Sequence, residues 1–365
     1  ENVDVEDVIQ EEKVIVTVTN KGYIKRTPLT SIRAQKRGGK GKTGIVTREE
    51  DFVSQLFSVS TLTPVLFFSS KGIVYRLKAW KIPEGSNTSK GKALANIFPI
   101  KADAQISSIL PLPYDESTWK DNFLIFVTAN GKIRKNSILD FENIQANGKI
   151  AMKLDKDDKI VSVKIVKKND DVMLNTYSGK SLRINASKIR IFKGRSSKGI
   201  KGINLKNNDK VISLTVLNHV ETTSEETKAY IKRTRKDDLE NTDDTNFEIS
   251  TKKYEELKLR EEFILTITEN GYGKRSSSYE FRESGRGGQG IINIISSERN
   301  GNIAASYSVK NDDDIMLITN KGQMIRCAVS DIRITGRNTQ GVRIFKVEKD
   351  EKVVSSVCLT DSVAD

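Results

Sequence analysis

The chain has 365 residues, of which 36% are hydrophobic and 30% are charged, and its formal net charge at pH 7 is +13. No apolar run reaches the roughly 18 residues of a membrane span, so neither a membrane segment nor a membrane partner is expected. Two cysteines, Cys327 and Cys358, are too few for a disulfide framework, and we expect both to be packed in a reduced, cytoplasmic protein that carries no secretory signal.

A β-rich hairpin pattern recurs six times along the chain. Each copy has a β-rich run, a short turn that ends in glycine, and a second run that carries Lys or Arg. The copies are Val14–Arg26, Pro64–Leu77, Phe123–Lys135, Val172–Ile184, Phe263–Arg275 and Ile315–Cys327. Their turn glycines are 50, 59, 48, 92 and 51 positions apart, and a period of about 50 residues is typical of propeller blades.

A second glycine follows each turn glycine 17 to 20 positions later. These second glycines are Gly41, Gly91, Gly148, Gly199, Gly290 and Gly341. After each comes another apolar run, a polar turn and a last strand, for example Ile200–Leu205, Asn207–Lys210 and Val211–Leu217. Four antiparallel strands in each of six units predict an all-β ring of small sheets with few exposed edges.

We therefore predict one domain over residues 1–365 that contains six blades and one insertion. The expected blades are approximately 13–60, 61–112, 113–166, 167–217, 259–309 and 310–360. Residues 218–258 lengthen the fourth interval and are expected to form a charged insertion, part helical and part disordered, that hangs off the ring. From His219 to Glu262 there are 13 acidic and 9 basic residues, so the rest of the chain carries a net charge of +17.

This positive charge falls at repeated places. One set follows the turn glycines: Lys25, Arg26, Arg76, Arg134, Lys135, Arg183, Lys274, Arg275 and Arg326. A second set lies near the second glycines: Lys36, Arg37, Lys40, Lys42, Lys90, Lys92, Arg195, Lys198, Arg286 and Arg337. Because a residue type kept in register recurs at the same radius in every blade, we expect a basic belt that binds duplex DNA through its phosphates.

The stretch Gln35-Lys36-Arg37-Gly38-Gly39-Lys40-Gly41 is the most specific segment of the chain. Its glycines let the backbone approach a partner closely, and its cations neutralise phosphate. Together with Gly22-Tyr23-Ile24-Lys25-Arg26 and Phe67-Phe68-Ser69-Ser70-Lys71-Gly72, it resembles the C-terminal domain of the DNA gyrase A subunit, whose marker is a box of this kind in the first repeat. The resemblance covers all six repeats, and residues 35–42 are expected to contact DNA.

The resemblance implies a β-pinwheel, a propeller relative in which each blade borrows a strand from its neighbour. It also implies that the domain wraps DNA around its rim, so that gyrase passes strands with a fixed handedness and introduces negative supercoils at the expense of ATP. The implied partners are duplex DNA, the gyrase B subunit, and the rest of the gyrase A subunit, in a tetramer of two A and two B subunits. ATP and magnesium are expected elsewhere in that enzyme, and the isolated domain is expected to be a monomer without a cofactor.

Three other functions stay open. The C-terminal domain of the topoisomerase IV A subunit is similar but lacks an intact box, and a propeller that binds proteins would use its loops without needing rim charge. A propeller enzyme would place several acids or histidines in its central funnel, where the repeat offers cations instead. We expect neither a catalytic residue nor a metal site in this chain. Gly41-Lys42-Thr43 lacks the first glycine of a P-loop, and His219, the single histidine, cannot complete a tetrahedral site with two scattered cysteines.

Overall fold

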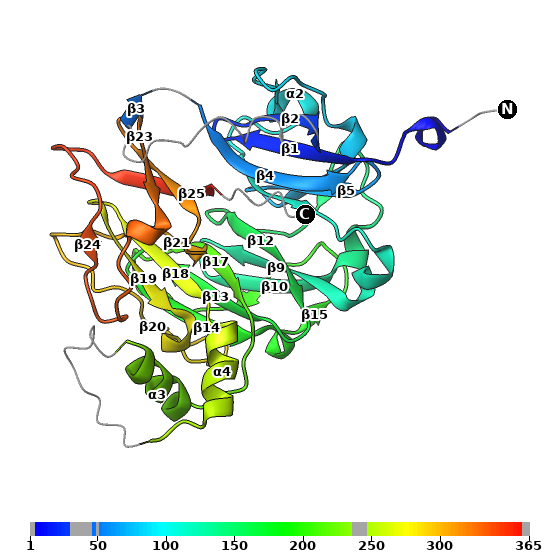
Figure 1. Cartoon of the computed structure of the whole chain (residues 1–365). Coiled ribbons are helices and arrows are strands. Elements are labelled where there is room, and N and C mark those ends of the chain that lie inside the picture. The colour runs from blue at the N-terminus through cyan, green and yellow to red at the C-terminus, as the bar shows by residue number, and fades with distance from the viewer. Residues whose placement is uncertain (1–3, 30–45, 49–50, 236–246, 360–365) are drawn as a thin grey trace.

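The computed structural model of the chain describes residues 4–29, 46–48, 51–235 and 247–359. Within these ranges the strands form six small sheets, each built on the hairpin of one sequence repeat. The sheets follow one another around a ring (Figure 1), so the predicted all-β fold of six propeller-like units is confirmed. None of the helices in the described ranges is long and apolar enough to cross a membrane.

Each sheet, called here blades 1 to 6 in chain order, takes three long strands from its own repeat. Blade 1 has β1 (Lys13–Thr19), β2 (Tyr23–Pro28) and β4 (Val53–Ser60), blade 2 has β5 (Pro64–Ser69), β6 (Ile73–Lys78) and β8 (Ile106–Pro111), and blade 3 has β9 (Asn122–Thr128), β10 (Lys132–Ser137) and β12 (Ile160–Lys167). Blade 4 has β13 (Asp171–Thr176), β14 (Lys180–Asn185) and β17 (Val211–Leu217), blade 5 has β18 (Phe263–Thr268), β19 (Tyr272–Ser277) and β21 (Ile303–Val309), and blade 6 has β22 (Asp314–Thr319), β23 (Gln323–Ala328) and β25 (Val353–Leu359). The last strands of the sets pack against one another in the order β8, β12, β17, β21, β25 and β4. These strands therefore lie nearest the centre, and the second hairpin strands lie toward the rim.

A short strand from the following repeat completes the outer edge of each sheet. These donated strands are β7 (Lys92–Ala93), β11 (Lys149–Ile150), β16 (Ile200–Lys201), β20 (Ile291–Ile292), β24 (Val342–Arg343) and β3 (Val46–Arg48). Because β3 of the first repeat pairs with β23 of blade 6, the same exchange closes the ring. The apolar run after each second glycine thus serves the neighbouring sheet, as the resemblance implies.

Blade 3 departs from the expected four-stranded antiparallel pattern. The short strand β15 (Ile191–Phe192) pairs in parallel with β10, which also pairs with β16, so this sheet has five strands. The remaining short elements are α2 (Leu94–Ile97) and the 3-10 turns η1 (Val5–Val8), η2 (Ala79–Lys81), η3 (Glu116–Asp121), η4 (Ile138–Phe141), η5 (Ala186–Lys188), η6 (Ser278–Glu280) and η7 (Val329–Asp331). In blades 2 to 6, one such turn directly follows the second hairpin strand.

The repeated second glycine is required by the strand exchange. Gly91 precedes β7 with a φ of +88°, and a Cβ atom there would lie 2.4 Å from the carbonyl oxygen of Ile24 in blade 1. Gly290 precedes β20 with a φ of +80°, and its Cβ atom would lie 2.7 Å from the carbonyl oxygen of Ser181. A side chain at these positions would push the donated strand away from the blade that it completes.

The apolar core lies between neighbouring sheets. The central strand β5 is buried along its whole length, because Val65 and Phe67 face blade 1 whereas Leu66 and Phe68 face blade 3. Successive side chains of a strand point to opposite faces of the sheet. A blade packed on both faces therefore needs the continuous apolar run that the sequence shows.

The insertion is a pair of helices that packs on blade 5. Helix α3 (Ser224–Thr234) begins with a capping box of Thr223 and Glu226, and α4 (Thr251–Arg260) runs back toward the ring. Tyr230 and Leu257 are buried in one cluster with Tyr279 of η6, and the Tyr279 hydroxyl donates to the Leu257 carbonyl over 2.6 Å. The expectation of a segment that hangs off the ring is wrong, because its apolar side is covered by η6. Residues 236–246 of the insertion lie outside the described residues, so the expectation of a disordered part stays a prediction.

This packing predicts different effects for two leucines on the same helix. Leu257 is fully buried and Leu259 is 88% exposed. Replacing Leu257 with Ala should lower the free energy of unfolding by about 2–5 kcal/mol, since it leaves a cavity under η6, whereas Leu259→Ala should change it by less than about 0.5 kcal/mol. Urea unfolding followed by circular dichroism measures both. Equal stability of the two variants would show that the helices do not dock on blade 5 in solution.

Candidate nucleic-acid interface

The basic box and the residue after it fall outside the described part of the chain. These residues are Gln35, Lys36, Arg37, Gly38, Gly39, Lys40, Gly41 and Lys42. Their role in DNA binding therefore stays a prediction. The structure does describe the equivalent loops of the other five repeats, which precede the donated strands at 83–91, 142–148, 193–199, 282–290 and 333–341. We call these five segments the rim loops.

Five of the repeated cations are buried. The exposed fraction is 0% for Arg134 and Lys274, 3% for Lys135, 6% for Arg183 and 7% for Arg275. The expectation that every cation in phase lies on an exposed belt is wrong for these five, because their charged groups are held inside the ring by backbone carbonyls. Buried cations persist only when acceptors of this kind surround them.

The cation four residues after the turn glycine ties its blade to the 3-10 turn of the next one. Arg26 Nε donates to the carbonyls of Trp80 and Ile82, over 3.2 and 2.7 Å. The same contact joins Lys135 to Ala186 over 2.7 Å, Arg183 to Ser278 over 2.8 Å, and Arg275 to Ile332 over 2.7 Å. The repetition of this cation therefore has a structural cause, namely the attachment of one blade to the next.

The cation three residues after the turn glycine holds the rim loop of the next repeat. Lys25 Nζ donates to three carbonyls, those of Ser86, Asn87 and Ser89, over 2.7–3.2 Å. In the same way Arg134 donates to the carbonyls of Arg195 and Ser197, and Lys274 donates to those of Gly336 and Arg337. Each of these three cations fixes the shape of a rim loop by binding two or three of its carbonyl groups.

Burial also changes the acidity of these groups. It lowers the pKa of Arg134 to about 10, with the nearby charge of Asp140 acting in the opposite direction. It lowers the pKa of Lys274 to about 7, against the charge of Glu280. Both shifts arise because removing a cation from water disfavours its charged form.

Two predicted cations after turn glycines have other surroundings. Arg326, in blade 6, forms an ion pair with Asp314 of its own sheet over 2.8 Å. Arg76 is half-buried, its Nε has no hydrogen-bond partner among the described residues, and burial lowers its pKa.

The rim loops and donated strands carry cations that do reach the surface. Lys90, Lys92, Lys198 and Arg286 are exposed, whereas Arg195 and Arg337 are half-buried. Lys90 lies 4.4 Å from the centre of the Tyr23 ring, and Lys198 forms a 2.5 Å ion pair with Asp155. An exposed pair of this kind contributes little and can be exchanged for another anion.

Arginines link successive rim loops around the outer edge. Arg195 Nη1 donates to the Ile150 carbonyl over 3.4 Å, Arg286 to that of Lys201 over 2.8 Å, and Arg337 to that of Ile292 over 2.7 Å. In each pair the acceptor belongs to the strand donated by the preceding repeat. The rim is therefore a linked series of backbone segments with cations on its outer side, which suits a long anionic partner.

The family of the chain follows from its six repeats. The family model described as DNA gyrase C-terminal domain, beta-propeller, matches residues 13–60, 63–113, 122–167, 170–218, 262–305 and 313–359. The chain belongs to this family. In sequence register, the rim loops correspond to the segment that carries the basic box in the first repeat.

Relatives and solved structures agree with this assignment. The DNA gyrase A subunit of Rickettsia bellii is 46% identical over 369 residues, across 99% of this chain and 41% of that protein. That of Staphylococcus aureus strain COL is 37% identical over 357 residues, across 98% of this chain and 35% of that protein. The chain thus spans about two fifths of these gyrase subunits.

The fold has been seen in two related domains. The crystal structure of the C-terminal domain of DNA topoisomerase IV matches with a TM-score of 0.73 and 24% identity, over 96% of this chain and 94% of that one. The DNA gyrase A C-terminal domain matches with a TM-score of 0.64 and 21% identity, over 96% and 100%. At these identities the likeness establishes the shared fold alone.

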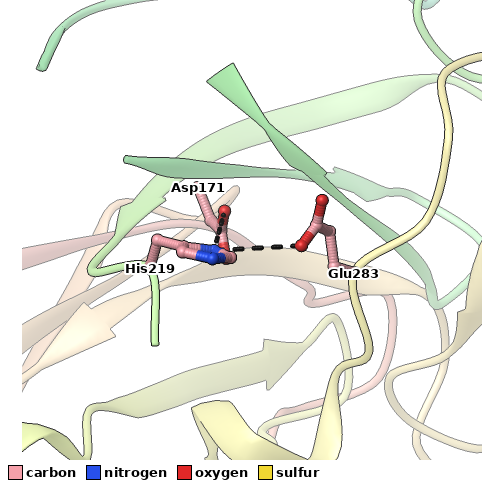
Figure 2. Close-up of side chains that lie close together, drawn as sticks. All are labelled: Asp171, His219 and Glu283. Carbon is pink, nitrogen blue, oxygen red and sulfur yellow. Dashed lines mark hydrogen bonds and ion pairs between the residues drawn. The ribbon is translucent and has the colours of Figure 1, made fainter. Parts of the chain in front are cut away.

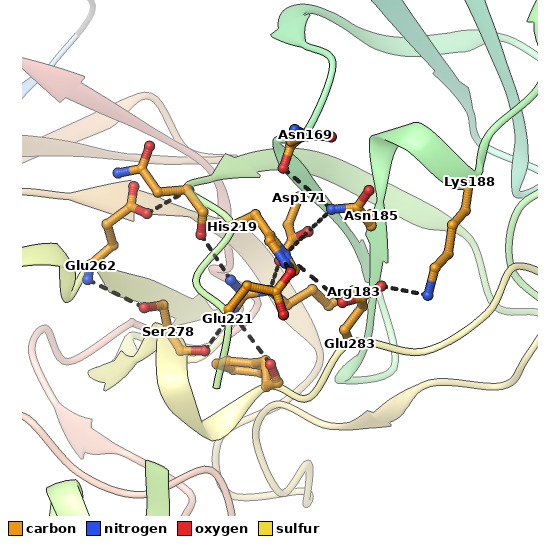
Figure 3. A network of polar contacts seen from close by, with 12 residues as sticks. Asn169, Asp171, Arg183, Asn185, Lys188, His219, Glu221, Glu262, Ser278 and Glu283 are labelled. Carbon is orange, nitrogen blue, oxygen red and sulfur yellow. Dashed lines mark hydrogen bonds and ion pairs between the residues drawn. The ribbon is translucent and has the colours of Figure 1, made fainter. Parts of the chain in front are cut away.

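One polar cluster has no counterpart in the sequence motifs. His219, at the start of the insertion, lies beside Asp171 of β13 and Glu283 of the fifth repeat (Figure 3). These residues are 48 and 64 positions from the histidine. No short spacing signals the cluster, because it forms only where blades 4 and 5 meet.

The difference between buried and exposed cations of the repeat leads to a prediction about stability. Arg134→Gln should lower the free energy of unfolding by about 3 kcal/mol or more, since one hydrogen bond from a charged group contributes about 1.5–3 kcal/mol. Lys90→Gln, on the exposed rim, should cost less than about 1 kcal/mol, which is the size of an exposed cation–π contact. Chemical unfolding of both variants makes the comparison. If Arg134→Gln is as stable as the parent, Arg134 does not hold the rim loop in solution.

Proposed function

We propose that this chain binds duplex DNA and wraps it around its rim. The observation that carries the proposal is the ring of rim loops, each holding or lying next to exposed cations at one repeated position. Because the loops follow one another around a closed series of blades, their charges describe a curved path. Duplex DNA is a partner long and anionic enough to follow such a path.

The contacts would be made to phosphates. Cations on loops and donated strands give no pattern of donors and acceptors for reading base edges, so binding should tolerate many sequences. Curving the duplex costs elastic energy, and the phosphate contacts along the rim must offset it. Each blade adds a contact to the same path, so a fragment that reaches several blades should bind more tightly than a short one.

The box at 35–41 would complete the path where the ring closes. Its strand β3 belongs to the outer edge of blade 6, so the first repeat provides the rim between the last blade and the first. Loss of its cations would break the path at that point while leaving the remaining rim loops in place. The box is therefore expected to matter more for wrapping than for binding.

In the whole protein, wrapping would serve strand passage. The curated relatives are gyrase A subunits, of which this chain spans about two fifths. We propose that the rest of the A subunit and the B subunit break and rejoin the DNA and bind ATP and magnesium. The whole would be a bacterial cytoplasmic enzyme of two A and two B subunits. This chain would set the handedness of the crossing that such an enzyme passes and so direct ATP-dependent negative supercoiling.

A topology assay tests wrapping directly. Nicked circular plasmid sealed by ligase in the presence of the domain should show a change in linking number that grows with protein concentration, because sealing traps the writhe of wrapped DNA. The change should shrink as salt rises, since each phosphate neutralised contributes about −0.9 to the slope of log affinity against log salt.

Two results would contradict the proposal. An unchanged linking number at saturating protein would mean that the domain binds DNA without curving it. The absence of salt-sensitive DNA binding would favour the other candidate, a propeller that binds proteins through its loops.

The box offers a second prediction. Replacing Lys36, Arg37 and Lys40 with Ala should abolish the linking-number change and reduce the salt slope by up to about 2.7, at roughly −0.9 for each phosphate that is no longer neutralised. Residual DNA binding should remain because the other rim loops keep their cations. A gel-shift titration and the ligation assay, run on the same protein, separate the two effects.

The matched control removes the same charge from the insertion. Lys252, Lys258 and Arg260 are exposed on α4, and their replacement by Ala should leave the linking-number change intact. If both triple variants lose wrapping equally, net charge and not the rim path governs the interaction. Unfolding curves of the two variants show whether either change has disturbed the fold.

A further inference from the structure

Three potential metal ligands converge where the insertion leaves the ring. His219 Nδ1 lies 3.0 Å from Asp171 Oδ1 and 3.8 Å from Glu283 Oε2 (Figure 2). All three ligand atoms lie within 4.8 Å of one another. The exposed fraction of the side chain is 2% for Asp171, 20% for His219 and 28% for Glu283.

The second polar atom of each side chain is already held by another residue (Figure 3). His219 Nε2 lies 2.9 Å from Glu221 Oε1, Asp171 Oδ2 accepts from Arg183 Nε over 2.9 Å, and Glu283 Oε1 pairs with Lys188 Nζ over 2.7 Å. These outer contacts leave Nδ1, Oδ1 and Oε2 facing one another.

We propose that Asp171, His219 and Glu283 form a binding site for a divalent transition metal of the Zn²⁺ type. Zinc–ligand distances of about 2.0–2.2 Å in a tetrahedral site put neighbouring ligands about 3.4 Å apart. The two distances from Nδ1 differ from that value by about 0.4 Å, which small side-chain rotations can supply. Water would take the fourth position, since His219 and Glu283 reach the surface.

The outer contacts are those that a zinc site uses. A ligating histidine commonly donates its other ring N–H to a carboxylate, which fixes the tautomer with a free lone pair toward the metal. Glu221 is placed to accept that hydrogen. Asp171 Oδ1 also accepts from Asn185 Nδ2 over 2.9 Å, and a carboxylate oxygen has a further lone pair for a metal.

The charges and donor types favour zinc over magnesium or calcium. Arg183 and Lys188 offset much of the negative charge of Asp171, Glu283 and Glu221. Surplus negative charge alone would therefore not draw a cation to this site. An imidazole nitrogen suits zinc, nickel and copper, whereas magnesium and calcium prefer oxygen ligands throughout. Millimolar magnesium should therefore not compete.

A bound metal would join three separate segments. Asp171 begins β13 of blade 4, His219 follows β17 at the root of the insertion, and Glu283 lies in the rim loop after η6. The insertion separates these two blades in sequence, so a metal here would fasten a junction that no short connection secures. The site goes beyond DNA wrapping and does not depend on it.

The same geometry has an explanation without metal. Burial acts to lower the pKa of His219, but the hydrogen bond to Glu221 and the charge of Asp171 outweigh it and raise that pKa above its ordinary value. As an imidazolium, His219 would donate to the carboxylates of Asp171 and Glu221, and the test below distinguishes that arrangement from a metal site.

The test uses the full chain of 365 residues without a histidine tag, in which His219 is the only histidine. Cys327 and Cys358 are replaced by Ser in every sample to remove thiol ligands. Calorimetric titration with ZnCl₂ at pH 7.5 should show one site, and CoCl₂ should give the visible absorption of a tetrahedral nitrogen and oxygen site. Zinc should raise the melting temperature and shift the single set of imidazole NMR signals.

The variants distinguish ligands from neighbours. His219→Ala and Glu283→Gln should lose the site, and Glu221→Gln should weaken it about 10–100-fold as an outer contact. Glu298→Gln removes an equal charge at an exposed position of the fifth repeat and should bind like the parent. Each variant is also melted without metal, which shows whether it is folded.

Three outcomes would overturn the proposal. One is an absence of zinc binding by the folded parent, and another is equal binding by His219→Ala. The third is an imidazole titration with a raised pKa that zinc does not alter, which would assign the cluster to the imidazolium alone.

Discussion

The structure depends on the unpaired edge that every repeat leaves on its own sheet. The second hairpin strand has backbone N–H and C=O groups on its outer side that the same repeat cannot satisfy, and such an edge is both costly and prone to aggregate. Two or three residues from the next repeat pair with it. Stability is therefore shared between neighbours, and no blade is complete until the following repeat is in place.

The lysines and arginines follow from this exchange. A donated strand of two residues has few hydrogen bonds of its own, so the loop before it needs other attachments. Cations supply them by donating to carbonyls of the next repeat: the cation at the third position after the turn glycine holds the rim loop, and the one at the fourth position holds the 3-10 turn that precedes it. The same residue types on the outer side of those loops stay in water. The repeated Lys and Arg residues thus have two roles: some attach one blade to the next inside the ring, and others place positive charge on its rim.

The junction of blades 4 and 5 shows how the exchange tolerates interruption. Strand β20 still completes blade 4, although the helices α3 and α4 separate the two repeats in sequence. The insertion covers η6 with Tyr230 and Leu257, and a polar cluster around His219 joins its root to both blades. Long connections cost little in chain entropy once both ends are held, so packing at the root is what makes this one acceptable.

The sequence by itself determined the number of blades, their hairpins and the positions of the second glycines, because apolar strand runs, turn residues and backbone sterics are local and recur with each repeat. It could not distinguish Lys274, which is buried, from Lys90, which is exposed, since both are cations in phase with a glycine. It also gave no sign that Asp171, His219 and Glu283 meet. Only the tertiary structure decided these points, because burial and convergence depend on which segment of a neighbouring repeat lies opposite, and that contact is not encoded in any short stretch of the chain.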